Sequence, residues 1–147
     1  MDDPLTPEDR EAIAWLAAAY AAAVDGRHFE RLRDVFTADA VLDTGASVRE
    51  GIDEIVAVME GLRRYESTAH LVGEQDVTPV GPDRCKAVTA CTAHHLSAMG
   101  AEGAGGRDAR RTDRVMYIRY HDDLVRTAVD GWRIDRRRLE VERVEEA

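Results

Sequence analysis

Among the residues that could carry acid–base chemistry, Asp25 stands in an unexpected place. The sequence predicts that a helix ends beside it at Gly26, so its carboxylate faces the negative end of the helix dipole. Apolar neighbours raise the cost of this charge, and we therefore expect a cationic partner. The chain's five histidines are the first candidates. A carboxylate that orients an imidazole makes a suitable general base near neutral pH. The pattern therefore points to proton transfer, or to a histidine–aspartate pair with a structural role only.

The positions of the other histidines divide them by their expected surroundings. His28 follows the helix end in a turn and is expected to be exposed. His94 and His95 are adjacent on a probable strand, so one faces inward and the other outward. Periodicity does not choose between them, because both alternating stripes are mixed. His121 precedes Asp122 and Asp123, but neighbours on a strand diverge, so this run does not predict a metal site.

Motifs for several other chemistries are absent from the sequence. It contains no HxH or HExxH spacing for a metal, no GxSxG nucleophile and no glycine-rich phosphate loop between a strand and a helix. Cys85 and Cys91 are six residues apart on a probable strand, about 20 Å at 3.3 Å per residue, so they are expected to be free thiols. We therefore expect neither a metal nor a cofactor.

The first helix is the element that must position Asp25. Thr6 is a suitable N-cap, Pro7 suits the first helical position, and Glu8 places an acid in the first turn. The segment Ala12–Val24 carries no charge. Its helical spacing predicts one buried stripe, formed by Ile13, Leu16, Ala17, Tyr20 and Val24.

The remaining segments predict helices first and strands after them. We expect a short helix over Phe29–Phe36, a short strand over Ala40–Asp43, a helix over Gly51–Arg64, and long strands over Glu66–Val80, Arg84–Met99, Asp113–Val129 and Trp132–Val144. Gly100–Gly106 is a glycine-rich loop, and Asp130–Gly131 is a hairpin turn. This order indicates an α+β fold, in which three helices lie on one face of a mostly antiparallel sheet.

The composition limits the class of protein. A chain of 147 residues with 44% hydrophobic and 33% charged residues suits one globular domain over residues 1–147. No apolar run reaches the roughly 20 residues of a membrane span, and the N-terminus lacks signal-peptide features, so we expect a cytoplasmic protein. The net charge of −9 argues against nucleic acid as a partner. Basic runs such as Arg136–Arg138 lie near acids, so we expect solvated faces or ion pairs there.

Three groups of residues together resemble the SnoaL-like branch of the nuclear transport factor 2-like, or cystatin-like, superfamily. They are Tyr20-x4-Asp25-x6-Leu32-x3-Phe36-x2-Asp39-Ala40, the run Thr68–Gly73, and the hairpin from Tyr120 to Arg137 around Asp130-Gly131-Trp132. The resemblance covers about Thr6 to Val141. It implies a cone-shaped α+β barrel, with a strongly bent sheet wrapped around the first helix and an apolar pocket open at one end.

The resemblance also implies site residues. It is strongest toward scytalone dehydratase, bile acid 7α-dehydratase and hexachlorocyclohexane dehydrochlorinase, lyases that remove a proton and expel a leaving group without a cofactor. Their helix-ending aspartate and strand histidine correspond to Asp25 and His70, and a polar residue of the site corresponds to Tyr20. A second histidine in scytalone dehydratase corresponds most nearly to His94. For substrate binding we expect Asp43, Trp15, Val24 and Phe36, although Asp43 also suits a strand-end carboxylate bound to backbone amides.

These residues lead to a first hypothesis of a cofactor-independent lyase or isomerase. In it, His70 removes a proton from a small, mostly apolar hydroxylated or carbonyl substrate, Asp25 orients His70, and Tyr20 and His94 manage the leaving group or the oxyanion. The alternatives are a non-catalytic module that binds small molecules and a polyketide cyclase of the aldol type. We expect no membrane partner, and a homodimer, with a trimer as the second choice.

Overall fold

The structure is a computed structural model that describes residues 4–99 and 110–147. Helical segments come first and long strands follow. In chain order the elements are α1 (Pro7–Asp25), the 3₁₀ segment η1 (Phe29–Asp34), β1 (Phe36–Asp43), β2 (Val48–Glu50), α2 (Ile52–Glu60), the 3₁₀ segment η2 (Gly61–Arg64), β3 (Ser67–Gly81), β4 (Arg84–Met99), β5 (Arg110–Thr127) and β6 (Gly131–Glu146). The loop predicted over Gly100–Gly106 lies outside the described residues.

Helix α1 begins and ends where its sequence predicts. The Thr6 hydroxyl accepts a hydrogen bond from the Asp9 backbone N–H at 3.0 Å, and the Asp9 carboxylate accepts one from the Thr6 N–H at 2.9 Å. Pro7 occupies the first turn, where its missing N–H leaves no bond unmade. Asp25 is the last helical residue and Gly26 is the C-cap. The caps thus place Asp25 at the end of the helix.

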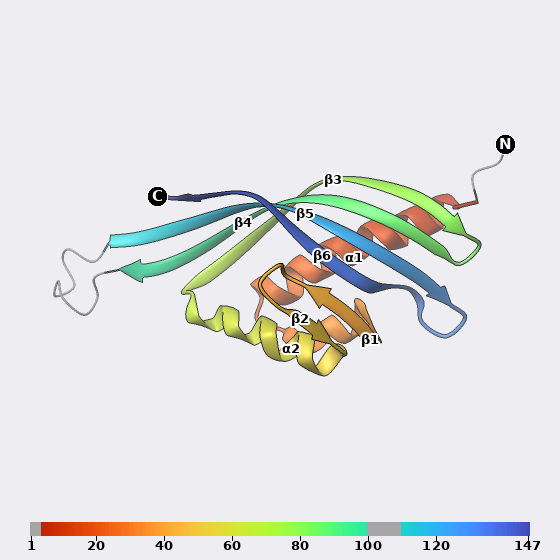
Figure 1. The fold of residues 1–147 in the computed structure, drawn as a ribbon, viewed down its shortest axis with the longest axis horizontal. Helices are drawn as coiled ribbons and strands as arrows, with labels where there is room; N and C mark the ends of the chain where they lie inside the picture. Colours follow the sequence, from red (N-terminus) through yellow and green to blue (C-terminus); the bar gives the residue numbers. More distant parts are fainter. Residues whose placement is uncertain (1–3, 100–109) are drawn as a thin grey trace.

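All six strands belong to one sheet with the order β2-β1-β6-β5-β4-β3. Neighbouring strands are antiparallel except β1 and β6, which are parallel. The long strands β3 to β6 curve over α1, and the short strands β1 and β2 lie beneath them together with α2 (Figure 1). Strands β2 and β3 are the two edges, so the sheet is curved without being closed. The predicted α+β class and bent, mostly antiparallel sheet are confirmed.

Two early segments differ from their predictions. The helix expected over Phe29–Phe36 is a 3₁₀ segment that ends at Asp34, and Phe36 instead begins strand β1. Strand β2 was not predicted and pairs with the end of β1. Its three residues are too few for an alternating pattern to be recognised in the sequence. The helix expected over Gly51–Arg64 is present as α2 followed directly by η2.

The core lies between α1 and the sheet. The predicted α1 stripe is buried in full: Ile13, Leu16, Ala17, Tyr20 and Val24. On β4, the residues of the inward stripe are also buried and mostly small: Cys85, Ala87, Thr89, Cys91 and Ala93. Both cysteines are free thiols, as predicted, and burial raises the pKa of the Cys85 thiol to about 11. Within the described part of the chain, no helix is long and apolar enough to cross a membrane.

Candidate functional site

The carboxylate of Asp25 meets the imidazole of His70 at the junction of α1 and β3. Asp25 Oδ1 lies 2.7 Å from His70 Nδ1, and Oδ2 accepts a hydrogen bond from the His70 backbone N–H at 2.7 Å. The Thr68 hydroxyl donates to Oδ1 at 3.0 Å. Burial works against the charged form, but the hydrogen bonds from His70 and Thr68 outweigh it and lower the pKa of Asp25. The partner expected for Asp25 is therefore His70 on β3, assisted by the hydroxyl of Thr68.

Arg27 supports this arrangement from the turn that follows α1. Its backbone adopts a left-handed conformation with φ of 60°, which is uncommon for a residue other than glycine. Its guanidinium donates to the hydroxyl oxygen of Thr68 at 3.2 Å and to the carbonyls of Val24 and Tyr65 at 3.3 and 3.4 Å. Because Thr68 in turn donates to Asp25, Arg27 fixes the position of the Thr68 hydroxyl that binds the carboxylate.

The contact with Asp25 determines the tautomer of His70. An ionised carboxylate only accepts hydrogen bonds, so the Nδ1 atom of His70 carries the hydrogen. The neutral ring then has a free electron pair on Nε2. The side chain is only 5% exposed and lines a cavity, so this second nitrogen is available to a molecule bound there. The arrangement is that of a histidine prepared to accept a proton.

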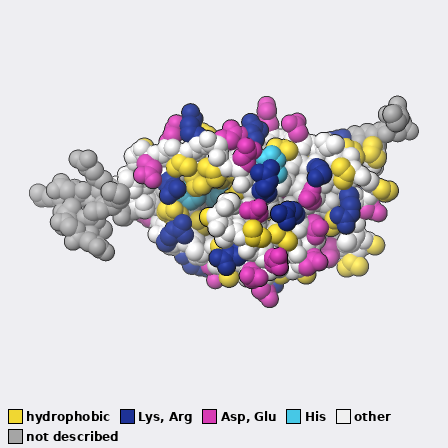
Figure 2. Space-filling view, in the orientation of Figure 1, with side chains coloured by type: hydrophobic (Ala, Val, Ile, Leu, Met, Phe, Trp, Pro, Cys, Tyr) yellow, Lys and Arg dark blue, Asp and Glu magenta, His cyan; other side chains and the backbone are white. Residues whose placement is uncertain are grey.

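The cavity has a volume of about 300 Å³, and the exposed residues among its lining include Arg64 of η2 and Arg114 of β5, which mark its opening. Its walls are largely apolar and aromatic, with residues from α1, α2, η2 and four strands. They are Tyr20, Thr44, Ala46, Met59, Leu62, Arg64, Tyr65, His70, His95, Arg114, Met116, Ile118, Tyr120, Leu139 and Val141. Figure 2 shows a hollow in which histidine is visible, bordered by hydrophobic side chains and flanked by basic ones. Such a cavity accepts a small, mostly apolar molecule.

Tyr20 brings a hydroxyl group to the buried wall of this cavity. Its ring lies edge-on to that of His70, with 6.2 Å between centroids. The hydroxyl donates to the sulfur of Met59 at 3.4 Å, and a thioether is a weak acceptor. Burial raises the pKa of Tyr20, so the hydroxyl keeps its proton. It is therefore a donor that a stronger acceptor in the cavity would attract.

His95 is the second histidine of the cavity. Its side chain is buried, and its ring centroid lies 6.0 Å from that of His70. Its Nδ1 donates to the carbonyl oxygen of Arg114 at 3.0 Å, so this ring also has its electron pair on Nε2. Burial lowers the pKa of His95, and the neighbouring His70, Arg114 and Arg64 lower it further. His95 therefore stays neutral near pH 7 and acts as an acceptor.

His94, which was expected to belong to the site, lies outside the cavity. His94 points to the other side of β4, where Nδ1 lies 2.7 Å from a carboxylate oxygen of Asp113. The reason is the strand register: His70 pairs with Ala93, so the two share a face, and His95 two residues later shares it too. The sequence contains no signal for this register, because it depends on how β3 and β4 pair.

Both the sequence and the fold of this chain match known proteins. Residues 6–138 match the profile of the SnoaL-like domain. The chain belongs to the SnoaL-like family. Among solved structures, the Kfla4162 protein of Kribbella flavida has a TM-score of 0.79 and 26% identity, covering 94% of this chain and 93% of that one. No curated protein matches the sequence.

Two further solved structures share the fold at lower identity. The hexachlorocyclohexane dehydrochlorinase LinA-type3 of Novosphingobium barchaimii LL02 has a TM-score of 0.77 and 14% identity, covering 97% of this chain and 94% of that one. A candidate scytalone dehydratase of Novosphingobium aromaticivorans DSM 12444 has a TM-score of 0.76 and 19% identity, covering 93% and 86%. The fold and family predicted from the sequence are confirmed.

Behind the cavity of this SnoaL-like domain lies a charged pair that the sequence analysis missed. Arg137 is 1% exposed and donates through Nε and Nη2 to the two carboxylate oxygens of Asp122, both at 2.8 Å. Its guanidinium lies 4.0 Å from the ring centroid of Tyr120 and 4.5 Å from that of Tyr20. Burial opposes its charge, but Asp122 outweighs this and raises the pKa of Arg137. Nη1 has no hydrogen-bond partner among the described residues.

The sequence offered one usable signal for this pair. Tyr120, Asp122 and Leu124 alternate along β5, and all three are buried. An acid in the middle of an inward stripe requires a cation within reach. The expectation of solvated faces or ion pairs for Arg136–Arg138 was therefore incomplete, because it did not anticipate that one ion pair would lie in the core.

Three residues expected to bind substrate lie outside the cavity. Trp15 is 54% exposed, because it projects from the face of α1 that turns away from the sheet. Val24 is fully buried in the core and Phe36 is 2% exposed, and neither lines the cavity. Phe36 packs edge-on against Tyr20, with 6.1 Å between ring centroids, and so supports the cavity wall from behind.

Asp43 has the strand-end role that was its alternative interpretation. Its carboxylate accepts a hydrogen bond from the backbone N–H of Gly45 at 2.9 Å, in the turn between β1 and β2. A nitrogen of Arg136 approaches the same carboxylate at 4.0 Å. Thr44 and Ala46 of this turn line the cavity, whereas Asp43 does not. Asp43, expected to bind substrate, thus lies outside the cavity and binds the turn instead.

The run His121-Asp122-Asp123 diverges as expected of a strand. His121 Nε2 lies 2.8 Å from Glu140, Asp122 points inward to Arg137, and Asp123 pairs with Lys86. In residues 4–99 and 110–147, no group of three or more His, Cys, Asp or Glu side chains is arranged to hold a metal ion.

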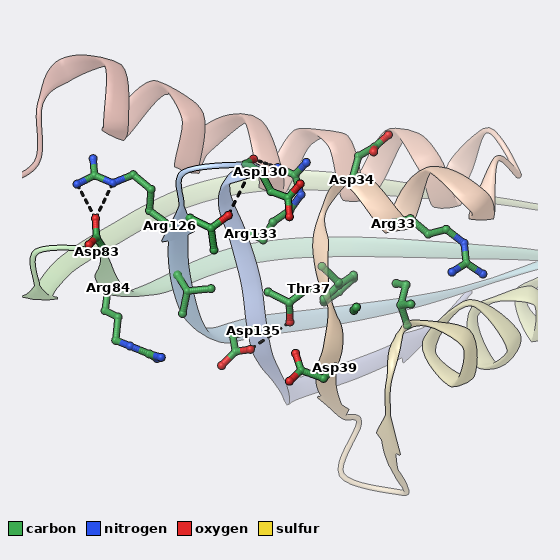
Figure 3. Close-up of a pocket in the computed structure, with 15 residues that line it drawn as sticks. Arg33, Asp34, Thr37, Asp39, Asp83, Arg84, Arg126, Asp130, Arg133 and Asp135 are labelled. Atoms are coloured by element: carbon green, nitrogen blue, oxygen red, sulfur yellow. Dashed lines mark hydrogen bonds and ion pairs between the residues drawn. The ribbon is translucent and has the colours of Figure 1, made fainter.

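A second hollow of about 670 Å³ lies beside the turns that connect β3 to β4 and β5 to β6 (Figure 3). Charged side chains dominate it, and several of these pair with one another. Arg126 contacts Asp83 at 2.9 Å, and Thr37 donates to Asp135 at 3.1 Å. None of the histidines lines this hollow. The smaller cavity, which His70 and His95 line, is therefore the candidate site of this SnoaL-like domain.

Proposed function

We propose that this SnoaL-like domain is a cofactor-independent lyase or isomerase. One observation carries the proposal: Asp25 holds Nδ1 of His70 at 2.7 Å while the same ring lines an apolar cavity. The substrate is a small, mostly apolar molecule with a hydroxyl or carbonyl group. The family and the fold shared with a dehydrochlorinase and a candidate scytalone dehydratase agree with this reaction class.

The proposed reaction begins with proton abstraction by Nε2 of His70. The C–H bond next to an electron-withdrawing group breaks, its electron pair remains on the substrate, and Asp25 stabilises the imidazolium. Tyr20 donates a hydrogen bond to the oxygen on which negative charge develops. In a lyase, a double bond forms as the leaving group departs with its electron pair. In an isomerase, His70 returns the proton to a different carbon.

In this scheme, His95 contributes as a neutral acceptor. Its lowered pKa makes it a poor proton donor, while its Nε2 is free to accept a hydrogen bond from a substrate hydroxyl. The proton that converts a departing hydroxide into water then comes from the His70 imidazolium. This returns His70 to its neutral form, so the protons balance over one turnover.

A β-hydroxy ketone tests both versions of the reaction. The hydrate of benzylideneacetone is incubated with the protein in deuterium oxide, and mass spectrometry follows deuterium uptake next to the carbonyl. Ultraviolet absorption follows formation of the conjugated enone. We expect uptake with the native protein, a loss of about 10²-fold or more in His70→Ala and Asp25→Asn, and no loss in the control His28→Ala. Full activity in both site variants would contradict the proposal. Binding without uptake or enone would favour the non-catalytic module.

A further inference from the structure

Two arginines flank the opening of the candidate cavity. Arg64 belongs to η2 and Arg114 to β5, so they approach the opening from different elements. The guanidinium of Arg64 lies 4.7 Å from the ring centroid of Tyr65, whose ring in turn lies 4.9 Å from that of His95. Arg114 is in register with His95 on the neighbouring strand, and residues in register share a face. Both arginines therefore lie next to His95.

Neither of these guanidinium groups is neutralised by a carboxylate within the described chain. Arg64 donates to the carbonyl of Gly61 at 3.1 Å and to the hydroxyl of Tyr65 at 3.3 Å, and both acceptors are neutral. The backbone carbonyl of Arg114 accepts the bond from His95, but its guanidinium forms no ion pair or hydrogen bond with any residue of the described ranges. Glu146 is in register with Arg114 on β6 without forming an ion pair.

Arginines elsewhere on the same sheet do pair with acids. Arg111 contacts Glu66 at 2.6 Å, and Arg119 forms an ion pair with Glu142. The chain as a whole carries a net charge of −9, so carboxylates are abundant. Yet among the fifteen residues that line the cavity there are two arginines and no aspartate or glutamate. The residues that line the cavity therefore carry positive charge, although the protein as a whole is acidic.

The size and polarity of the cavity limit where an anionic group could lie. About 300 Å³ of largely apolar space accommodates a single ring or a short hydrocarbon body. A carboxylate pushed into that space would lose its hydration without gaining an equivalent partner. At the opening, it remains partly hydrated and accepts hydrogen bonds from guanidinium groups, which match its geometry.

We propose that the cavity selects substrates with a carboxylate, which Arg64 and Arg114 hold at the opening while the apolar body enters toward His70. This rests on the proposed function, because it names the substrate class for the same site. The reacting carbon then lies a few bonds from the carboxylate, and the carboxylate keeps its charge through the reaction. The two arginines thereby orient the substrate and increase its rate of capture.

Phenylbutyrate and phenylbutyramide form a matched pair of probes, since they share one apolar body and differ in charge. Isothermal titration calorimetry at low ionic strength measures Kd for both with native protein, Arg64→Gln, Arg114→Gln and the double variant. We expect the native protein to prefer the carboxylate about tenfold or more, each single variant to lower this ratio several-fold, and the double variant to lose it. The control Arg111→Gln, outside the cavity, should keep the native ratio.

Equal affinity for the two probes, failure of phenylbutyrate to bind at millimolar concentration, or a ratio unchanged in the double variant would overturn the inference. The variant His70→Ala separates it from the proposed function, because this variant should keep the carboxylate preference while losing deuterium uptake. A native protein with the preference but no deuterium uptake would contradict only the proposed function. Deuterium uptake without the preference would contradict only the carboxylate inference.

Discussion

The rings of His70 and His95 lie with their centroids 6.0 Å apart and their planes at 77°. Each ring uses Nδ1 for a bond to the protein, to Asp25 in one case and to the carbonyl of Arg114 in the other. The Nε2 atoms of both rings are therefore free to accept a hydrogen bond or a proton from a molecule in the cavity. The two acceptors differ in environment, since a carboxylate supports a positive charge on His70 and no carboxylate contacts His95 within the described residues.

Replacing His94 and His95 one at a time tests which of these adjacent histidines acts in the site. We expect His95→Ala to lower deuterium uptake by about tenfold or more, because the substrate loses an acceptor inside the cavity. His94→Ala should remain within about twofold of the native rate, since His94 contacts Asp113 on the opposite face. The same mass-spectrometric assay measures both. A larger effect of His94→Ala would contradict the register in which β3 pairs with β4.

The pH dependence of His95 follows from its lowered pKa. Burial lowers it below the ordinary value of 6.5, so the unfolded chain takes up a proton before the folded one does. The contribution of neutral His95 to the free energy of unfolding is therefore fully present above about pH 6.5. It decreases as the pH falls from there toward the pKa of His95 in the folded protein. NMR titration of the ring should place its midpoint below 6.5. Urea unfolding of His95→Gln should show a flatter pH dependence in this window, and a midpoint above 6.5 would contradict the account.

Replacing only one partner of the buried pair Arg137–Asp122 should lower the free energy of unfolding more than replacing both. Arg137→Met leaves Asp122 buried without its partner, and we expect about 3–5 kcal/mol of lost unfolding free energy. Asp122→Leu should cause a similar loss. The double variant should recover a large part of it, because no buried charge then remains. Chemical denaturation of all four proteins measures the coupling, and additive losses would contradict it.

Asp9 should make α1 sensitive to acid. It accepts hydrogen bonds from the indole of Trp132, the Thr6 backbone and Arg126. The Trp132 hydrogen bond is the largest cause that lowers the pKa of Asp9 to about 2 from 3.8. Its stabilisation is present above about pH 4 and is lost as the pH falls toward 2.

Urea unfolding between pH 5 and 2 measures this contribution. Asp9→Asn should be less stable at pH 5 and show a flatter acid dependence, while the exposed control Glu11→Gln should follow the native curve. We expect Asp9→Ala to lose about 2 kcal/mol at pH 5, since it removes the capping box and leaves the Trp132 N–H unpaired. Parallel curves for Asp9→Asn and the native protein would show that Asp9 does not titrate with folding.

The local elements were predictable because their signals are local. The cap at Thr6, the stripe that contains Tyr20 and the terminator at Gly26 all lie within one helix, and each acts over a few residues. The need of Asp25 for a partner follows from the same local argument. The identity of that partner as His70 came from the family resemblance, because forty-five residues separate the two in the chain.

The tertiary structure alone decided which side chains enter the cavity. His95 rather than His94 faces His70 because β3 and β4 pair in one register, and a shift by one residue would reverse every side chain. Arg137 is buried because β6 brings it opposite Asp122 on β5. Trp15 is exposed because the sheet covers only one side of α1. The sequence by itself determined most of the elements and the charge that required a partner, whereas the site depends on pairings between distant segments, which no local pattern encodes.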